Sequence, residues 1–256
     1  MTIVLEKARK VALVTGGTRG IGQGIAWALA HAGCDLVVNY KETSAEEVAR
    51  LKDEADSLGI STLFVRADIT KRVDIERMMQ IVKESYGCID ILVNNAGILN
   101  KQPFRRLTEK NFDKHIATNL KGAVMVTRKA IPLLERSQKG KIIFVSSASA
   151  YSYTKKSEIF SYAVSKAGLM GVTRGLAIEL APKILVNCVA PAYIETDMLL
   201  RETSDAENEA RKSRTLLGRF GKPEEVGKLV AYLASPDADF ITGQTFHING
   251  GRYFGG

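Results

Sequence analysis

The chain has 256 residues, of which 45% are hydrophobic and 25% are charged, a composition typical of a soluble globular protein. The formal net charge is +8, but basic residues are interspersed with acidic ones and form no dense block with aromatic residues between them. We therefore expect no nucleic-acid binding. The first residues reach a charge at Glu6 without a long apolar run, and no stretch approaches the ~18 apolar residues of a membrane span. We predict a cytoplasmic protein with no membrane contact.

Cysteine and histidine residues are few and far apart. The cysteines at positions 34, 88 and 188 have no paired metal-ligand spacing, and the histidines at 31, 115 and 247 are equally scattered. This pattern predicts reduced thiols and no metal site.

Apolar runs of strand length alternate with helix-length segments along the whole chain. The strand-like runs are residues 10–15, 35–39, 62–69, 90–97, 141–147, 184–191 and 244–250. Strands that are almost wholly apolar and separated by amphipathic helices indicate a parallel sheet covered on both faces. We predict one α/β domain over residues 1–256, a doubly wound, Rossmann-type parallel sheet of about seven strands with helices on both faces.

Residues 193–222 interrupt this alternation. The segment is long for a connection in such a fold, and it mixes charged residues with exposed-looking Met and Leu residues. Long connections of this kind are often functional, so we predict a lid that closes over the substrate.

A glycine-rich turn, "TGGTRGIG" (15–22), lies between the first strand and the first helix. Glycines let the backbone approach a pyrophosphate, and a helix N-terminus offers free N–H donors. The spacing differs from the common G-x-G-x-x-G pattern, and a tight turn without a ligand would explain it equally well. However, Asp68 after the third strand and "NNAG" (94–97) after the fourth would lie on the same carboxyl edge of the sheet, where open α/β folds bind ligands.

A tyrosine and a lysine one helical turn apart, Tyr162 and Lys166, share a helix face. A phenol has a pKa near ~10, and a neighbouring cation would favour the phenolate and lower that pKa. On their own, ordinary packing of Tyr162 and solvation of Lys166 would explain the pair as well.

Taken in order, "TGGTRGIG", Asp68, "NNAG", Asn119 in "IATNLKG", "VSS" and Tyr162-x-x-x-Lys166 resemble the short-chain dehydrogenase/reductase family over nearly the whole chain. Within that family the phrases "VALVTGGTRGIG", "VVNY" and "TGQTFHINGG" are most similar to those of 3-oxoacyl-[acyl-carrier-protein] reductases, although members acting on other ketones share them.

The resemblance implies four catalytic residues. Tyr162 would be the general acid that protonates the carbonyl oxygen. Lys166, together with the cationic nicotinamide of the oxidised cofactor, would lower the pKa of Tyr162 and would also hold the nicotinamide ribose. Asn119 would hold a water that links Lys166 to solvent, and Ser147 would be the catalytic serine.

The choice of serine depends on how the family pattern is aligned. Ser147, the second residue of "VSS", matches by its place at a strand end, whereas counting back from Tyr162 selects Ser149. We prefer Ser147, because the end of a strand fixes a side chain better than a distance across a loop does. The substrate contacts expected are Ser147, Ser149, Tyr151 and Tyr162. Tyr153 or Phe160 could also line the pocket, or simply pack within the loop.

The resemblance also implies the residues that bind the cofactor. They are Gly16, Thr18, Arg19, Gly20, Ile21, Gly22, Asn39, Tyr40, Lys41, Asp68, Ile69, Asn95, Ala96, Gly97, Tyr162, Lys166, Pro191, Ile194 and Thr196. The family usually has Gly after the proline of "VAPAYIETDM", where this chain has Ala192.

We predict NADPH/NADP+ as the cofactor. NAD-preferring sites end their second strand with an acidic residue that would repel a 2′-phosphate. Here that strand ends in Asn39, Tyr40 and Lys41. Arg19 would face the same ribose, and arginine binds phosphate through paired charge-assisted bonds.

The predicted function is an NADPH-dependent reductase that transfers a hydride to a ketone, with a 3-oxoacyl thioester on acyl carrier protein as the expected substrate. The alternatives are a dehydrogenase or reductase of a small alcohol, sugar or cyclic ketone, and a redox-inactive nucleotide sensor. The sensor is disfavoured because the chain keeps all four catalytic residues.

Two partners are expected. Small residues on the helix after Tyr162 predict close approach of a second copy and a homotetramer, or at least a dimer, although packing against the chain's own sheet could account for some of them. They are Ala163, Ala167, Gly168, Gly171 and Gly175. An acidic carrier protein could dock on cations at the ends of two long helices, which equally could be solvated surface. These cations are Arg128, Lys129, Arg136, Lys139 and Lys183.

Overall fold

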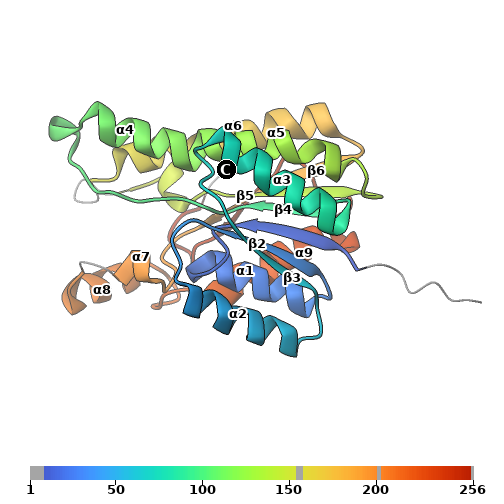
Figure 1. The fold of residues 1–256 in the computed structure, drawn as a ribbon. Helices are drawn as coiled ribbons and strands as arrows, with labels where there is room; N and C mark the ends of the chain where they lie inside the picture. The colour runs from blue at the N-terminus through green and yellow to red at the C-terminus, as the bar shows by residue number, and fades with distance from the viewer. Residues whose placement is uncertain (1–8, 154–157, 201–202, 255–256) are drawn as a thin grey trace, which may run out of the picture.

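The computed structural model describes residues 9–153, 158–200 and 203–254, and these are built around a seven-stranded parallel sheet (Figure 1). The strands lie in the order β3-β2-β1-β4-β5-β6-β7. Their bounds are β1 Val11–Thr15, β2 Asp35–Tyr40, β3 Thr62–Arg66, β4 Ile91–Asn94, β5 Gly140–Val145, β6 Ile184–Pro191 and β7 Thr245–Ile248. The predicted fold class is confirmed. The order reverses between β1 and β4, which is where open sheets of this type bind ligands.

The apolar strands carry two hydrophobic cores, one on each face of the sheet. Along β1, Val11 and Leu13 belong to one core, while Ala12 and Val14 belong to the other. Successive side chains of a strand point to opposite faces, so a strand covered on both sides must be apolar at every position. This is the physical reason for the continuous apolar runs in the sequence.

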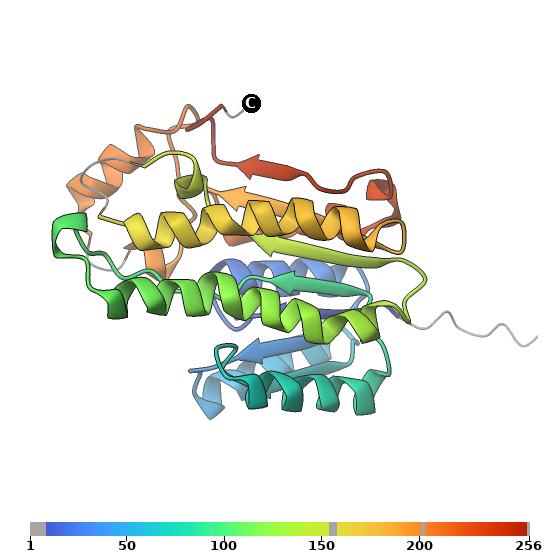
Figure 2. The same cartoon turned by 90° about the horizontal axis from the view of Figure 1, so that it is seen from above.

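Helices cover both faces (Figures 1 and 2). On one face lie α1, α2 and α9, and on the other lie α3, α4, α5 and α6. Their bounds are α1 Gly20–His31, α2 Ala45–Ser57, α3 Arg72–Tyr86, α4 Glu109–His115, α5 Ala123–Leu134, α6 Phe160–Leu180 and α9 Pro223–Ala234. Helices α1 and α9 cross with their backbones almost touching, because a Cβ on Gly227 would lie only 2.3 Å from the Gly24 carbonyl oxygen.

The continuous helical stretch formed by α4 and α5 has an irregular middle. Between α4 and α5 the chain forms a π-helical turn, Ile116–Gly122, with Asn119 buried inside it. Such wider turns inside α-helices frequently occur at functional sites.

The described parts of the segment 193–222 project beyond the carboxyl ends of the strands and include two short helices, α7 Asp197–Leu200 and α8 Asp205–Lys212 (Figure 1). The two stems of the segment pair with each other. Glu195 donates its amide to the Gly221 carbonyl at 2.8 Å, and Gly221 donates to the Tyr193 carbonyl at 2.9 Å. The part between the stems exposes Met198, Leu200 and the pair Leu216–Leu217. Its role as a lid stays a prediction.

Within the described ranges, none of the helices combines the length and the apolar character needed to cross a bilayer.

Candidate active site

The predicted site residues come from segments that meet at the carboxyl edge of the sheet. We divide them into a ribose end, formed by Arg19, Lys41 and Asp68, and a catalytic end, formed by Asn119, Ser147, Tyr162 and Lys166. The glycine turn lies between β1 and α1.

The glycine turn is packed too tightly for side chains. Gly16 and Gly20 have φ values of +63° and +53°, which favour glycine. A Cβ on Gly22 would lie 2.1 Å from the Gly16 carbonyl oxygen and 2.4 Å from Asn95 Nδ2. Thr196 lies over the turn, because a Cβ on Gly20 would be 3.2 Å from its Cγ2.

A pair of side chains ties the glycine turn to the end of β4. Asn95 donates through Nδ2 to the carbonyls of Thr15 and Gly16, each at 3.0 Å. In return, the Thr15 hydroxyl accepts the amides of Asn95 at 3.0 Å and Ala96 at 3.1 Å. The turn and the "NNAG" segment are therefore held as one rigid unit, which explains why both carry small or amide residues.

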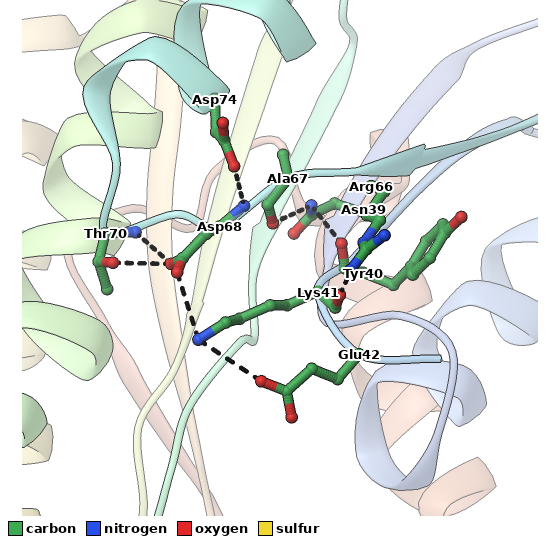
Figure 3. Close-up of polar contacts among 9 residues, drawn as sticks. All are labelled: Asn39, Tyr40, Lys41, Glu42, Arg66, Ala67, Asp68, Thr70 and Asp74. Carbon is green, nitrogen blue, oxygen red and sulfur yellow. Dashed lines mark hydrogen bonds and ion pairs between the residues drawn. The ribbon is translucent and has the colours of Figure 1, made fainter. Parts of the chain in front are cut away.

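At the ribose end, Lys41 reaches from the end of β2 to the carboxylate of Asp68 (Figure 3). The Lys41 Nζ lies 3.2 Å from Asp68 Oδ2 and 3.6 Å from Glu42 Oε1. The Asp68 Oδ1 accepts from the amide and hydroxyl of Thr70, at 2.9 and 2.7 Å. Burial acts to raise the pKa of Asp68, but the bonds from Thr70 and Lys41 outweigh it and hold that pKa below its usual value.

The remaining residues at the end of β2 point in different directions. The Asn39 side chain turns into the sheet, where Nδ2 donates to the carbonyls of Val65 at 3.2 Å and Ala67 at 3.0 Å. The Tyr40 ring points away from the Lys41–Asp68 contact (Figure 3). Direct cofactor contact by Asn39 and Tyr40 stays a prediction.

Arg19 stands free at the start of α1. It is exposed, and among the described residues its side chain forms no hydrogen bond or ion pair. Next to it, the Thr18 hydroxyl lies 2.9 Å from that of Thr43, which connects the glycine turn to the loop after β2. A glycine cradle with no room for a Cβ, a helix N-terminus and an unpaired guanidinium together fit a phosphorylated dinucleotide.

At the catalytic end, the Ser147 side chain acts on Tyr162 as a hydrogen-bond partner that lowers the pKa of the phenol. The Ser147 Oγ also accepts the Ser149 amide at 3.1 Å. The choice of Ser147 over Ser149 as the catalytic serine stays a prediction. Burial raises the pKa of Tyr162, and the bond from Ser147 lowers it by less. The expected lowering by Lys166 is not found in this structure. The second expected cause of a lower pKa at Tyr162, the positive charge of the oxidised nicotinamide, would act only when the cofactor is bound.

Lys166 is 4% exposed and directs its ammonium to the sheet. Its Nζ donates to the Val145 carbonyl at 2.7 Å and lies 5.8 Å from the centre of the Tyr162 ring. Burial lowers the pKa of Lys166 to about 8, which brings it near neutral pH. An ammonium has three protons to donate, so two remain for groups in the site.

Asn119 uses both ends of its amide within the chain. Its Oδ1 accepts from the Ile98 amide at 2.8 Å, and Nδ2 donates to the Ile98 carbonyl and to Ser165 Oγ, each at 3.0 Å. A Cβ on Gly97 would lie 3.3 Å from both Asn119 Oδ1 and Lys166 Nζ, so these two groups converge there. Its role in holding a water stays a prediction.

The aromatic residues predicted near the substrate are divided between two places. The Tyr151 ring packs against those of His247 and Tyr253, with centroids 4.6 and 5.2 Å away. Phe160 instead packs edge-on against Phe104 at 4.8 Å. Tyr153 is 44% exposed. Substrate contact by any of them stays a prediction.

The segment after β6 has Ala192 at the position where the family usually has glycine, and its backbone does not require a glycine there. Among the described residues, Glu158 is the only non-glycine with positive φ, so Ala192 holds an unstrained backbone.

Ile194 is buried against Gly221, and Thr196 caps α7 by accepting the Leu199 amide at 3.4 Å. Pro191 ends β6, and Ile69 packs against Gly122 of the π-helical turn.

Two features of the site were missed from the sequence. One is the Lys41–Asp68 ion pair, for which nothing in the spacing gives a signal. The other is His115, which is buried and accepts the Asn100 amide at 3.1 Å. Its position four residues before Asn119 could have indicated a shared helix face.

The chain matches known proteins over nearly its full length. Residues 16–252 match the family model described as enoyl-(acyl carrier protein) reductase. The chain is 38% identical over 248 residues to the 3-oxoacyl-[acyl-carrier-protein] reductase FabG of Staphylococcus aureus, covering 96% of this chain and 99% of the relative.

Solved structures agree with this match. A short-chain dehydrogenase from Burkholderia cenocepacia in complex with NADP has a TM-score of 0.88 at 35% identity, covering 95% of this chain and 97% of that one. A putative gluconate dehydrogenase from Agrobacterium tumefaciens has a TM-score of 0.89 at 31% identity, covering 98% of each chain. Together with the sheet order and the glycine turn, these matches confirm the resemblance found in the sequence: the chain belongs to the short-chain dehydrogenase/reductase family.

Proposed function

We propose that this protein is an NADPH-dependent reductase that acts on a ketone, and that its substrate is a 3-oxoacyl thioester carried on acyl carrier protein. The observation that carries the proposal is the convergence of Ser147, Tyr162 and Lys166 beside a glycine turn with no room for side chains. The 3-oxoacyl-[acyl-carrier-protein] reductase relative, 38% identical over almost the whole chain, supports the substrate class.

The cofactor would lie along the carboxyl edge of the sheet. Its pyrophosphate would rest on the glycine turn and the free N–H groups at the start of α1. Arg19 and Lys41 would bind the 2′-phosphate, since no carboxylate ends β2. When bound, the nicotinamide supplies the hydride.

The chain's own residues supply the proton. As negative charge develops on the carbonyl oxygen, the Tyr162 hydroxyl donates its proton to that oxygen. The Ser147 hydroxyl, oriented by the Ser149 amide, donates a hydrogen bond at the same place. Lys166, with a pKa of about 8, would return a proton to Tyr162 through its remaining donors.

A second candidate function has its own support. The putative gluconate dehydrogenase among the similar structures favours a sugar or small alcohol as the substrate. Steady-state rates on a panel of 3-oxoacyl thioesters, sugar acids and simple ketones, with both NADPH and NADH, decide between the two. A kcat/KM for the thioesters below that for a sugar acid would reject the proposed substrate.

Docking of the carrier protein on the five predicted cations has limited support. Four are engaged within the chain: Lys129 with Glu76, Arg136 with the Gly87 carbonyl, Lys139 with Asp239, and Lys183 with the Ser137 carbonyl. Arg128 remains. If docking on this face is real, kcat/KM for the carrier-bound substrate falls more steeply with salt than that for a free thioester.

We also propose that the enzyme assembles as a homotetramer through α6. A Cβ on Gly168 would collide with Leu120 of the same chain, so this glycine serves internal packing. Gly171 and Gly175, however, have nothing within 4 Å of a Cβ, and Ile178 on the same helix is 83% exposed. A monomer mass by light scattering at micromolar concentration would reject this assembly.

A further inference from the structure

A segment that is neither helix nor strand, residues 98–102, leads from the cofactor side of the site to a bridge beside the start of the helix that carries Tyr162. It follows Gly97, which lies beside Lys166 and Asn119. It ends at Gln102, which forms a bridge with Ile159, the residue before α6. The segment therefore passes across the catalytic end.

Alternate amides of this segment are held from outside it. The Ile98 amide donates to Asn119 Oδ1 at 2.8 Å, the Asn100 amide to His115 Nε2 at 3.1 Å, and the Gln102 amide to the Glu158 carbonyl at 2.7 Å. Glu158 holds a positive φ of 51°, a conformation that costs free energy in a non-glycine residue. Two of the three anchors come from one helical surface, four residues apart.

The hydrogen bonds of His115 define its protonation state. Nδ1 lies 2.8 Å from the Asn111 carbonyl oxygen, which can only accept, so Nδ1 carries the proton. Nε2 faces the Asn100 amide, which can only donate, so Nε2 must keep its lone pair. A second proton on the ring would place two N–H groups against each other. The ring is fully buried, with 0% exposure, so no solvent would compensate.

We propose that His115 is a positioning residue for the carbonyl substrate, and that it acts by holding Asn100 and the segment 98–102 against the catalytic end. Asn119 fixes the cofactor-proximal part of the segment, and Glu158 fixes the part next to α6. His115 holds the middle, where no other described group contacts the Asn100 amide. The inference rests on the proposed reduction at Tyr162.

Two substitutions of His115 separate positioning from simple packing. His115→Leu removes the acceptor, so the Asn100 amide loses its partner in a partly buried hydrogen bond. His115→Gln offers a carbonyl oxygen near the position of Nε2 and cannot titrate. With acetoacetyl-coenzyme A and NADPH, His115→Leu is expected to lower kcat/KM for the thioester roughly five- to tenfold, mainly through KM, because a hydrogen bond is lost. The dissociation constant of NADPH stays within about twofold, and His115→Gln restores most of the loss.

The pH profile gives an independent readout. The pKa of His115 is lowered by burial, is raised by the bond to Asn111 to a smaller extent, and is lowered by Lys114. Other ionisable residues lie on the segment 98–102, on α4, on the π-helical turn and at the start of α6. They are Lys101, Glu109, Lys110, Asp113, Lys121, Glu158, Tyr162 and Lys166. As pH falls from the ordinary value of 6.5 through the lowered value, wild-type kcat/KM decreases as the ring takes up a proton. This decrease is absent in His115→Gln.

The matched control is His31→Gln. His31 also bonds through Nδ1 to the carbonyl four residues earlier, at 2.7 Å, but it is exposed at the end of α1. The His31→Gln substitution is expected to leave kcat, KM and the pH profile unchanged.

Hydrogen–deuterium exchange over residues 98–102 decides the inference whichever carbonyl compound the enzyme reduces. Faster exchange is expected in His115→Leu and wild-type exchange in His115→Gln. His115→Met serves as the acceptor-free variant if the leucine variant does not fold. An acceptor-free variant with wild-type kcat, KM and exchange would overturn the inference. No turnover of the thioester by the wild type would reject the proposed substrate and leave the exchange experiment intact.

Discussion

At the catalytic end of the site, Lys166 is 4% exposed and donates to a main-chain carbonyl. At the ribose end, the Lys41 side chain is 58% exposed and its ammonium lies between two carboxylates. Both are lysines that the family pattern assigns to the cofactor. Burial lowers the pKa of Lys166, whereas the bond to Asp68 raises the pKa of Lys41.

This difference in burial indicates how strongly a substitution at each end should affect the enzyme. In a buried environment a charge costs free energy unless a partner is bound, so protonation and ligand binding are strongly coupled. In an exposed environment water and salt screen the same charge. We therefore expect substitutions at the catalytic end to change rates and stability greatly, and substitutions at the ribose end to change cofactor preference modestly and in a salt-dependent way.

The largest effect is expected from Tyr162→Phe. The change removes one hydroxyl and keeps the ring, so kcat decreases by ~10²–10⁴-fold, the usual contribution of a general acid, while NADPH binding is retained. Tyr86→Phe is the matched control, because that hydroxyl bonds to Ser61 on the surface. Retention of half the wild-type kcat in Tyr162→Phe would exclude the assigned role.

The two serines provide the next test of the catalytic end. The Ser147 side chain acts to lower the pKa of Tyr162, whereas Ser149 contributes its amide to Ser147. Ser147→Ala is therefore expected to lower kcat by ~10²–10³-fold, as for one lost donor to a developing negative charge. Ser149→Ala keeps the amide and is expected to change kcat less than threefold. A larger loss in Ser149→Ala would reverse the assignment.

Lys166→Met tests whether the buried ammonium of Lys166 lowers the stability of the folded protein. The pKa of Lys166 lies at about 8, against an ordinary value of 10.5. Between these values, as pH falls, the unfolded chain binds a proton before the folded one does, so wild-type stability decreases and the full penalty is present below pH 8. A shift of this size corresponds to roughly 3 kcal/mol.

The variant is therefore expected to lose activity. At pH 7 its free energy of unfolding is expected to be higher than that of the wild type by about 1–3 kcal/mol, so that it unfolds at a higher urea concentration. The gain shrinks as pH approaches 10.5. Denaturation of the cofactor-free protein at one fixed protein concentration measures it, and Lys52→Met on the exposed face of α2 is the control. A variant less stable than the wild type at pH 7 would show that the Val145 bond outweighs burial.

Some features of the site could be predicted from the sequence, and others could not. The parallel sheet and its glycine turn followed from apolar strands and from glycines at a strand–helix junction, because these are local consequences of backbone geometry. The choice of Ser147 over Ser149 rests on a strand end fixing the direction of a side chain, and it stays a prediction. The inward turn of Asn39, the ion pair of Lys41 and the neutral His115 could not be predicted, since each depends on which buried groups of another element need partners.

At the ribose end, Arg19→Ala is expected to have the larger of two effects. Its guanidinium is exposed and unpaired among the described residues, so it can bind a phosphate without breaking another contact. The KM for NADPH is expected to increase about tenfold, with a change of less than twofold for NADH. Equal kcat/KM for both cofactors in the wild type would show that this end does not recognise the 2′-phosphate.

The smallest effect is expected from Lys41→Ala, because Lys41 must share its charge with Asp68 and Glu42 before it contributes to a phosphate. We expect a two- to threefold increase in the KM for NADPH at low salt and almost none at about 0.5 M salt, where exposed charges are screened. Glu42→Gln tests the same point from the other side: removing one competing carboxylate frees Lys41 and lowers the KM for NADPH slightly. Measurements of both variants with NADPH and NADH across ionic strength check this. If Lys41→Ala raised the KM for both cofactors equally and independently of salt, Lys41 would act by holding Asp68 in place, and the ribose end would resemble the catalytic end more than its exposure indicates.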